Sequence, residues 1–237
     1  MRAAADLRKS ERTVGAMTST DPHDLKAVLW DMDGTLVDTE PYWMAAQRDL
    51  AATHGVEWTA DNARPTVGQA MQVSAAMLQH HGVPLSAGDI INELLKRVVA
   101  KLEEGIPWLP GAERILADLA AAGIPSALVT MAFSPVATRV ASAAPIGTFH
   151  AVVAGDMVPQ GKPHPAPYLA AAELLGVEPS SCVAVEDSVS GTTSAQAAGM
   201  DVVVVPGVVR PSAAAGRHFV ASLEAVTVET LRNILRG

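Results

Sequence analysis

Two pairs of carboxylates have the residue types and spacing that are suited to binding a metal ion. Asp31 and Asp33 follow one apolar run of the chain, and Glu186 and Asp187 follow another. Residues two apart on an extended chain point to the same side. Carboxylates crowded at buried strand ends repel one another unless a cation lies among them. Oxygen ligands, with no histidine or cysteine at ligand spacing, favour Mg²⁺ over zinc or copper.

Two further polar residues follow other apolar runs. Thr130 comes directly after the run at 126–129, and Lys162 lies in a loop rich in glycine and proline. The Thr130 hydroxyl and the amide of Met131 can hydrogen-bond a phosphate oxygen, while the lysine can hold the phosphate and offset the carboxylate charge. Taken singly, each has a plainer explanation, because threonines often end strands and most lysines are solvated. The recurrence of such groups after several strands favours the functional interpretation.

The apolar runs and the segments between them predict the elements that position these residues. Continuous apolar runs predict parallel strands that are buried on both faces, and the segments of helical period between them predict crossover helices. We therefore predict an α/β fold with a doubly wound, Rossmann-like parallel sheet, whose ligand crevice lies beyond the carboxyl ends of the strands. The expected strands are 27–30, 126–129, 151–154, 182–185 and 202–205, and the expected helices are 112–121, 135–143, 167–175 and 191–198.

A long insertion separates the first expected strand from the second. Residues 41–106 repeat apolar residues at helical spacing over 42–54, 71–80 and 87–103, with no convincing buried strand. We predict that this segment is an inserted α-helical cap domain. The catalytic core is then expected to consist of 25–40 and 107–237.

The first part of the chain carries no targeting signal that we recognise. Residues 1–24 lack the apolar central stretch of a secretory signal and are expected to be a disordered arm. Met17 is an alternative start, in which case residues 1–16 would not belong to the native protein. No run is long enough to span a bilayer, and we expect a cytoplasmic protein.

The composition of the chain limits the classes of partner that we expect it to bind. The chain has 237 residues, of which 49% are hydrophobic, and its formal net charge is -8, from 25 acidic and 17 basic residues. Such a chain has no basic stripe to hold a polyanion, so we expect no nucleic acid and no membrane as partners. A small phosphorylated metabolite is compatible with this charge, because a metal ion and a local cation can bind it. The single cysteine, Cys182, is expected to be buried and excludes intrachain disulfides, and the size is compatible with a monomer.

Four segments of the sequence resemble the four motifs of the haloacid dehalogenase superfamily, in the order of that family. They are 31–39 (DMDGTLVDT), 128–130 (LVT), 161–163 (GKP) and 185–191 (VEDSVSG), and the resemblance extends over residues 26–207. Ser188 and Gly191, with the AAGM that follows them, are most similar to the beta-phosphoglucomutase-like and sugar-phosphate phosphatase branch. That branch carries a helical cap inserted after the first motif.

The resemblance implies a mechanism and a role for each motif residue. Asp31 would attack phosphorus and form an aspartyl-phosphate, and Asp33 would act as general acid and then general base. Thr130 and Lys162 would stabilise the phosphate oxygens.

The resemblance also implies Mg²⁺ as the cofactor. The carboxylates of Asp31 and Asp187 and the backbone carbonyl of Asp33 would hold the ion, with Glu186 acting through water. The implied activity is that of a phosphatase acting on a small phosphorylated metabolite, such as a sugar or polyol phosphate.

A phosphomutase of the beta-phosphoglucomutase type and a non-catalytic phosphate-binding module are the alternatives. Beta-phosphoglucomutases usually carry a histidine shortly after the first motif, where this chain has Trp43, and an arginine in the first cap loop. Here Gly68 is followed by Gln69, Ala70 and Met71. Both departures favour a hydrolase, and Gln69 becomes a candidate specificity residue. A binding module would require the loss of a motif residue, and none is lost.

Overall fold

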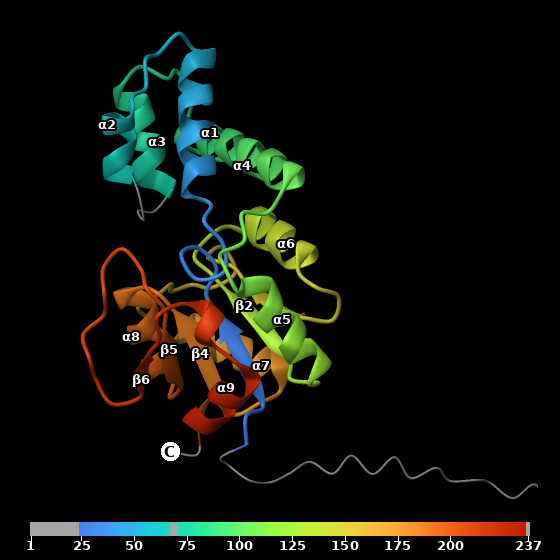
Figure 1. Ribbon diagram of the computed structural model, residues 1–237. Coiled ribbons are helices and arrows are strands. Elements are labelled where there is room, and N and C mark those ends of the chain that lie inside the picture. Colours follow the sequence, from blue (N-terminus) through green and yellow to red (C-terminus); the bar gives the residue numbers. More distant parts are fainter. Residues whose placement is uncertain (1–23, 67–70, 236–237) are drawn as a thin grey trace, which may run out of the picture.

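The computed structural model describes residues 24–66 and 71–235 and shows a twisted parallel sheet with helices on both faces (Figure 1). In the described residues the sheet has the order β3-β2-β1-β4-β5-β6, and all neighbouring strands are parallel. The predicted α/β, Rossmann-like class is therefore confirmed. The strands are β1 (Ala27–Trp30), β2 (Ser126–Val129), β3 (Phe149–Val153), β4 (Cys182–Glu186), β5 (Asp201–Val204) and β6 (Arg217–Phe219).

Alternating side chains of each strand bury against different helices. On β1, Val28 and Trp30 belong to the core that includes α5 and α9, while Ala27 and Leu29 belong to the core that includes α7 and α8. Burial on both faces explains why the strands are continuous apolar runs rather than alternating ones. The helices that cover the sheet are α5 (Ala112–Ala121), α6 (Ser134–Ala143), α7 (Ala166–Leu175), α8 (Val189–Ala197) and α9 (Val228–Ile234).

Two elements at the C-terminal end of the chain were not predicted. Strand β6 lies at the edge of the sheet and is only partly buried, so its sequence, Arg217 to Phe219, contains no apolar run. Helix α9 is seven residues long and begins at a cap in which the Thr227 hydroxyl accepts the amide of Thr230. A helix of that length shows too little periodicity to stand out in the sequence.

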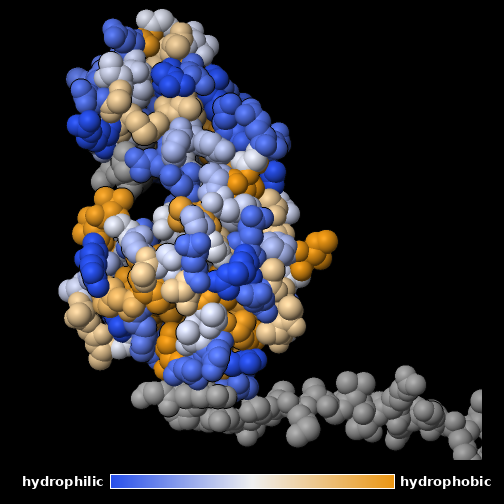
Figure 2. Space-filling model, in the orientation of Figure 1, coloured by the Kyte–Doolittle hydropathy of each residue, from blue (hydrophilic) through white to orange (hydrophobic). Residues whose placement is uncertain are grey.

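The insertion folds into helices that lie beyond the carboxyl ends of the strands (Figure 1). Its three predicted helical segments are helices, whereas the short α2 was not predicted. In the view of Figure 2, mostly hydrophilic residues cover this body, and a hollow separates part of it from the sheet. The helices are α1 (Glu40–Thr53), α2 (Ala60–Ala63), α3 (Met71–His80) and α4 (Ala87–Glu104).

The chain leaves and re-enters the sheet-containing body through two segments that run side by side. The amide of Asp38 donates to the Pro107 carbonyl at 3.0 Å, and the amide of Leu109 donates to the Leu36 carbonyl at 2.8 Å. Helix α4 also packs against α6. Among the described helices, none combines the length and the apolar character needed to cross a bilayer.

Cys182 gives a test of the packing around β4. The residue is fully buried, as predicted, and burial, with the nearby Glu178 carboxylate, raises the pKa of its thiol to about 12. Only about one thiol in ten thousand is then ionised at pH 8, and the thiolate is the reactive form. We expect an aromatic disulfide reagent to leave the native protein unmodified while it labels the urea-unfolded chain with one equivalent. Rapid labelling of the native protein would contradict this packing.

Candidate active site

The ammonium group of Lys162 lies between two carboxylates where β1, β2 and β4 end. Its Nζ is 2.6 Å from Asp31 Oδ1 and 2.6 Å from Glu186 Oε1, and it donates to the Val129 carbonyl at 2.9 Å. The lysine side chain is 3% exposed and that of Glu186 is 0% exposed. Because an ammonium has three protons, these three contacts use all of them. One cation therefore ties together the ends of three strands.

Glu186 accepts hydrogen bonds on both of its carboxylate oxygens. Oε1 accepts the Tyr168 hydroxyl at 2.7 Å in addition to Lys162, while Oε2 accepts the Ser188 hydroxyl at 3.0 Å and the Ser188 amide at 3.4 Å. The Lys162 ammonium also lies 5.2 Å from the centre of the Tyr168 ring. A buried carboxylate needs such partners, since leaving it unpaired would cost several kcal/mol.

The charges around Lys162 do not balance. Burial alone would lower the pKa of Lys162, but the charges of Asp31 and Glu186 raise it above its ordinary value. Burial, followed by repulsion from Glu186, raises the pKa of Asp31 well above its ordinary value, even though Lys162 acts in the opposite direction. Burial and the same glutamate raise the pKa of Asp187 to about 6. One lysine thus leaves excess negative charge at this edge of the sheet.

A divalent cation fits this excess charge. Asp31, Glu186 and Asp187 each offer one carboxylate oxygen, and these oxygens lie within 4.8 Å of one another. A donor set made only of oxygen suits Mg²⁺. Because Glu186 already accepts from Lys162, Tyr168 and Ser188, the acceptor capacity for a direct ligand lies with Asp31 and Asp187.

Asp33 occupies a different environment from Asp31. The Thr39 hydroxyl donates a hydrogen bond to Asp33 Oδ1. Burial raises the pKa of Asp33 to about 6, although the bond from Thr39 opposes this shift. A carboxyl group whose pKa is raised in this way lies closer to working pH than an ordinary aspartate, which favours its giving and taking a proton as a general acid and base.

The loop after β2 is joined to the lysine loop. The buried Thr130 hydroxyl accepts the Ala132 amide at 3.0 Å, which leaves its own proton available for donation. Met131 is exposed, and its Sδ accepts the Lys162 amide at 3.3 Å. The Met131 contact and the bond from Lys162 Nζ to the Val129 carbonyl place the loop that contains Thr130 next to the lysine. The candidate Gln69 lies outside the described residues.

The part that Tyr168 plays in this cluster was not predicted. It stands six residues after Lys162, in the first turn of α7, and is fully buried. A signal for it exists, since a tyrosine within an alanine-rich helix near a candidate lysine has a hydroxyl that needs a buried partner. Apolar spacing alone gives no indication of which partner that is.

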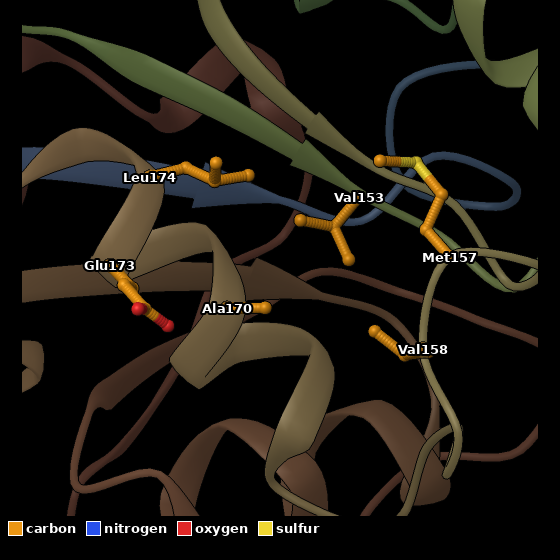
Figure 3. A pocket seen from close by; sticks show the side chains of 6 residues that line it. All are labelled: Val153, Met157, Val158, Ala170, Glu173 and Leu174. Carbon is orange, nitrogen blue, oxygen red and sulfur yellow. The ribbon is translucent and has the colours of Figure 1, made fainter.

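An open, largely apolar pocket lies beside β3 and α7, and its lining includes none of the residues of the charged cluster (Figure 3). The side chains that line it come from the end of β3, the loop that follows it and the outer side of α7. They are Val153, Met157, Val158, Ala170, Glu173 and Leu174. The pocket is therefore separate from the candidate active site.

Gly191 tests how tightly the site is packed. A Cβ at this position of α8 would overlap the carboxylate atoms of Glu186. We expect Gly191→Ala to lower the free energy of unfolding by about 1–3 kcal/mol, because either the glutamate or the helix must shift. Gly88, in α4, is the matched helical control, since the nearest atom to its Cβ would lie 3.9 Å away. Gly88→Ala should match the parent or stabilise it, and equal urea midpoints for the two variants would contradict the packing.

Comparison with known proteins identifies the family. Residues 25–199 match the model of the haloacid dehalogenase-like hydrolases. Hexitol phosphatase B of Escherichia coli (strain K12) is 32% identical over 222 residues, which cover 90% of this chain and 98% of the relative. Hexitol phosphatase A of the same strain is 37% identical over 182 residues, which cover 76% of this chain and 82% of the relative.

A solved structure agrees with this placement. The crystal structure of CbbY from Rhodobacter sphaeroides in complex with phosphate is similar to this chain with a TM-score of 0.76 and 31% identity. The match covers 87% of this chain and 99% of that chain. This chain therefore belongs to the haloacid dehalogenase-like hydrolases, in the branch that contains the sugar-phosphate phosphatases.

Proposed function

We propose that this chain hydrolyses the phosphate monoester of a hexitol or a related sugar or polyol, with Mg²⁺ as cofactor. The observation that carries the proposal is the buried Lys162 ammonium, 2.6 Å from both Asp31 and Glu186, beside the acidic group of Asp187. Similarity to two hexitol phosphatases along most of the chain supports the choice of substrate class.

The first half of the reaction transfers the phosphoryl group to the protein. A carboxylate oxygen of Asp31 attacks phosphorus, an Asp31–phosphorus bond forms, and the bond from phosphorus to the ester oxygen breaks. Asp33 gives its proton to the departing alcohol. Lys162 and the Thr130 hydroxyl stabilise charge on the phosphate oxygens as it moves.

The second half returns the protein to its starting state. Water attacks phosphorus, Asp33 takes the proton of that water, and the Asp31–phosphate bond breaks to release inorganic phosphate. Asp31, Asp187 and the backbone carbonyl of Asp33 would hold Mg²⁺, with Glu186 acting through water. When bound, the ion supplies positive charge that allows two anions, the carboxylate and the phosphate, to approach each other.

The inserted helices have a separate role in this proposal. Residues 41–106 form a cap over a core made of 25–40 and 107–237, and the cap selects the alcohol part of the ester and excludes bulk water. Support comes from the position of α1–α4 beyond the strand ends and from the paired connecting segments, in which Asp38 and Leu109 are hydrogen-bonded across. The hollow visible in Figure 2 lies between these two bodies.

A phosphate-release assay tests the function. The substrates are a hexitol phosphate, a hexose phosphate, glycerol phosphate and phosphoglycolate, each assayed with Mg²⁺ and with a chelator. We expect Mg²⁺-dependent release, with the highest kcat/KM for the hexitol or hexose ester. Asp31→Asn should lower kcat by about a thousandfold or more, since the amide cannot form the phosphorylated intermediate.

Asp118→Asn is the matched control, because this aspartate forms a partly exposed ion pair with Arg114 on α5. It should retain the parental kcat. Full Mg²⁺-dependent turnover by Asp31→Asn would contradict the proposed nucleophile. Isomerisation of a hexose phosphate with little free phosphate would favour a mutase, and an inactive parent across the panel would favour a binding module.

A further inference from the structure

Tyr168 is a buried hydroxyl in contact with the charged cluster but outside the proposed chemistry. It is fully buried in the first turn of α7, and its hydroxyl donates to Glu186 Oε1 at 2.7 Å. Burial and the adjacent Glu186 charge raise the pKa of Tyr168 well above its ordinary value. Because a carboxylate oxygen accepts, the hydroxyl is the donor of this hydrogen bond.

The hydroxyl shares its acceptor atom with Lys162. Glu186 Oε1 is 2.6 Å from the lysine Nζ and 2.7 Å from the tyrosine oxygen. The other glutamate oxygen is already held by Ser188. When one carboxylate oxygen accepts two hydrogen bonds, each is weaker than a single bond would be. The Tyr168 hydroxyl therefore weakens the interaction between Glu186 Oε1 and the Lys162 ammonium. It also fixes the direction from which Oε1 meets the ammonium.

The same ammonium also contacts Asp31, the proposed nucleophile. Lys162 Nζ lies 2.6 Å from Asp31 Oδ1, equal to its distance from the glutamate. If Oε1 lost the tyrosine hydroxyl, the lysine would be the one donor to that atom among the described residues. We expect the ammonium then to move towards Glu186 and away from Asp31.

We propose that Tyr168 is a positioning residue: its hydroxyl, through Glu186, divides the Lys162 ammonium between the glutamate and Asp31. The inference rests on the proposed function, because it assigns a role in that reaction. Tyr168 contacts Glu186, which would act on Mg²⁺ only through water, and its described hydrogen bond goes to neither Asp31 nor Asp187. Its effect should therefore appear in the rate of phosphoryl transfer and not in substrate binding.

Tyr168→Phe removes the hydroxyl and keeps the ring that fills the core. We expect kcat for p-nitrophenyl phosphate with Mg²⁺ to fall about tenfold, while KM changes by less than about twofold. Rates are expressed per folded molecule, with the folded fraction taken from urea unfolding monitored by circular dichroism. Ser142→Ala is the control, because it removes an exposed hydroxyl of α6 that donates to the Arg139 carbonyl at 3.0 Å, outside the cap and the charged cluster. It should leave kcat unchanged.

A double-mutant cycle with Glu186→Gln shows whether the tyrosine acts through the glutamate. In the Glu186→Gln background, Tyr168→Phe should change kcat by less than about twofold, since the residue through which it acts is already altered. Losses that simply multiply would overturn the proposal, as would a Tyr168→Phe variant with parental kcat. Because p-nitrophenyl phosphate is a general phosphate ester, the outcome does not depend on the hexitol assignment. A parent that is inactive on every ester would instead count against the proposed function.

Discussion

The arrangement of the candidate active site depends on one buried cation, the Lys162 ammonium. The Lys162 side chain is almost inaccessible to solvent and lies between the carboxylates of Asp31 and Glu186. Burying any of these charges without an opposite charge beside it would cost several kcal/mol in folding free energy. The need to pair these buried charges explains which residues occupy several neighbouring positions. Tyr168 and Ser188 complete the hydrogen bonds of Glu186, and Gly191 keeps α8 close enough for that arrangement.

The sheet explains how these groups come together. Continuous apolar runs place β1, β2 and β4 side by side and parallel, so their carboxyl ends meet at one edge. Asp31 follows β1, the Val129 carbonyl ends β2 and Glu186 ends β4. The lysine arrives from a separate loop, and its three protons reach all three strands. Burial against helices on both faces fixes the strands and therefore fixes these distances.

Much of this arrangement could be predicted from the sequence, because it follows from strong local patterns. Apolar runs indicated five of the strands, and the polar residues after them indicated the site edge. The edge strand β6 could not be predicted in this way, since Arg217 and His218 interrupt any apolar run. Tyr168 could not be assigned because its partner, Glu186, is distant in sequence and is reached only through the fold. The loop that contains Gln69 lies outside the described residues, so that candidate remains a prediction.

The Lys162 ammonium holds two buried carboxylates in place. Urea unfolding of Lys162→Met at neutral pH, without Mg²⁺, tests it most directly, with Lys96→Met as a control on the exposed Lys96–Glu93 pair. We expect Lys162→Met to lower the free energy of unfolding by about 3–5 kcal/mol. We expect Lys96→Met to lower it by less than about 1 kcal/mol. A Lys162→Met variant as stable as the parent would show that the ammonium does not hold these carboxylates in place.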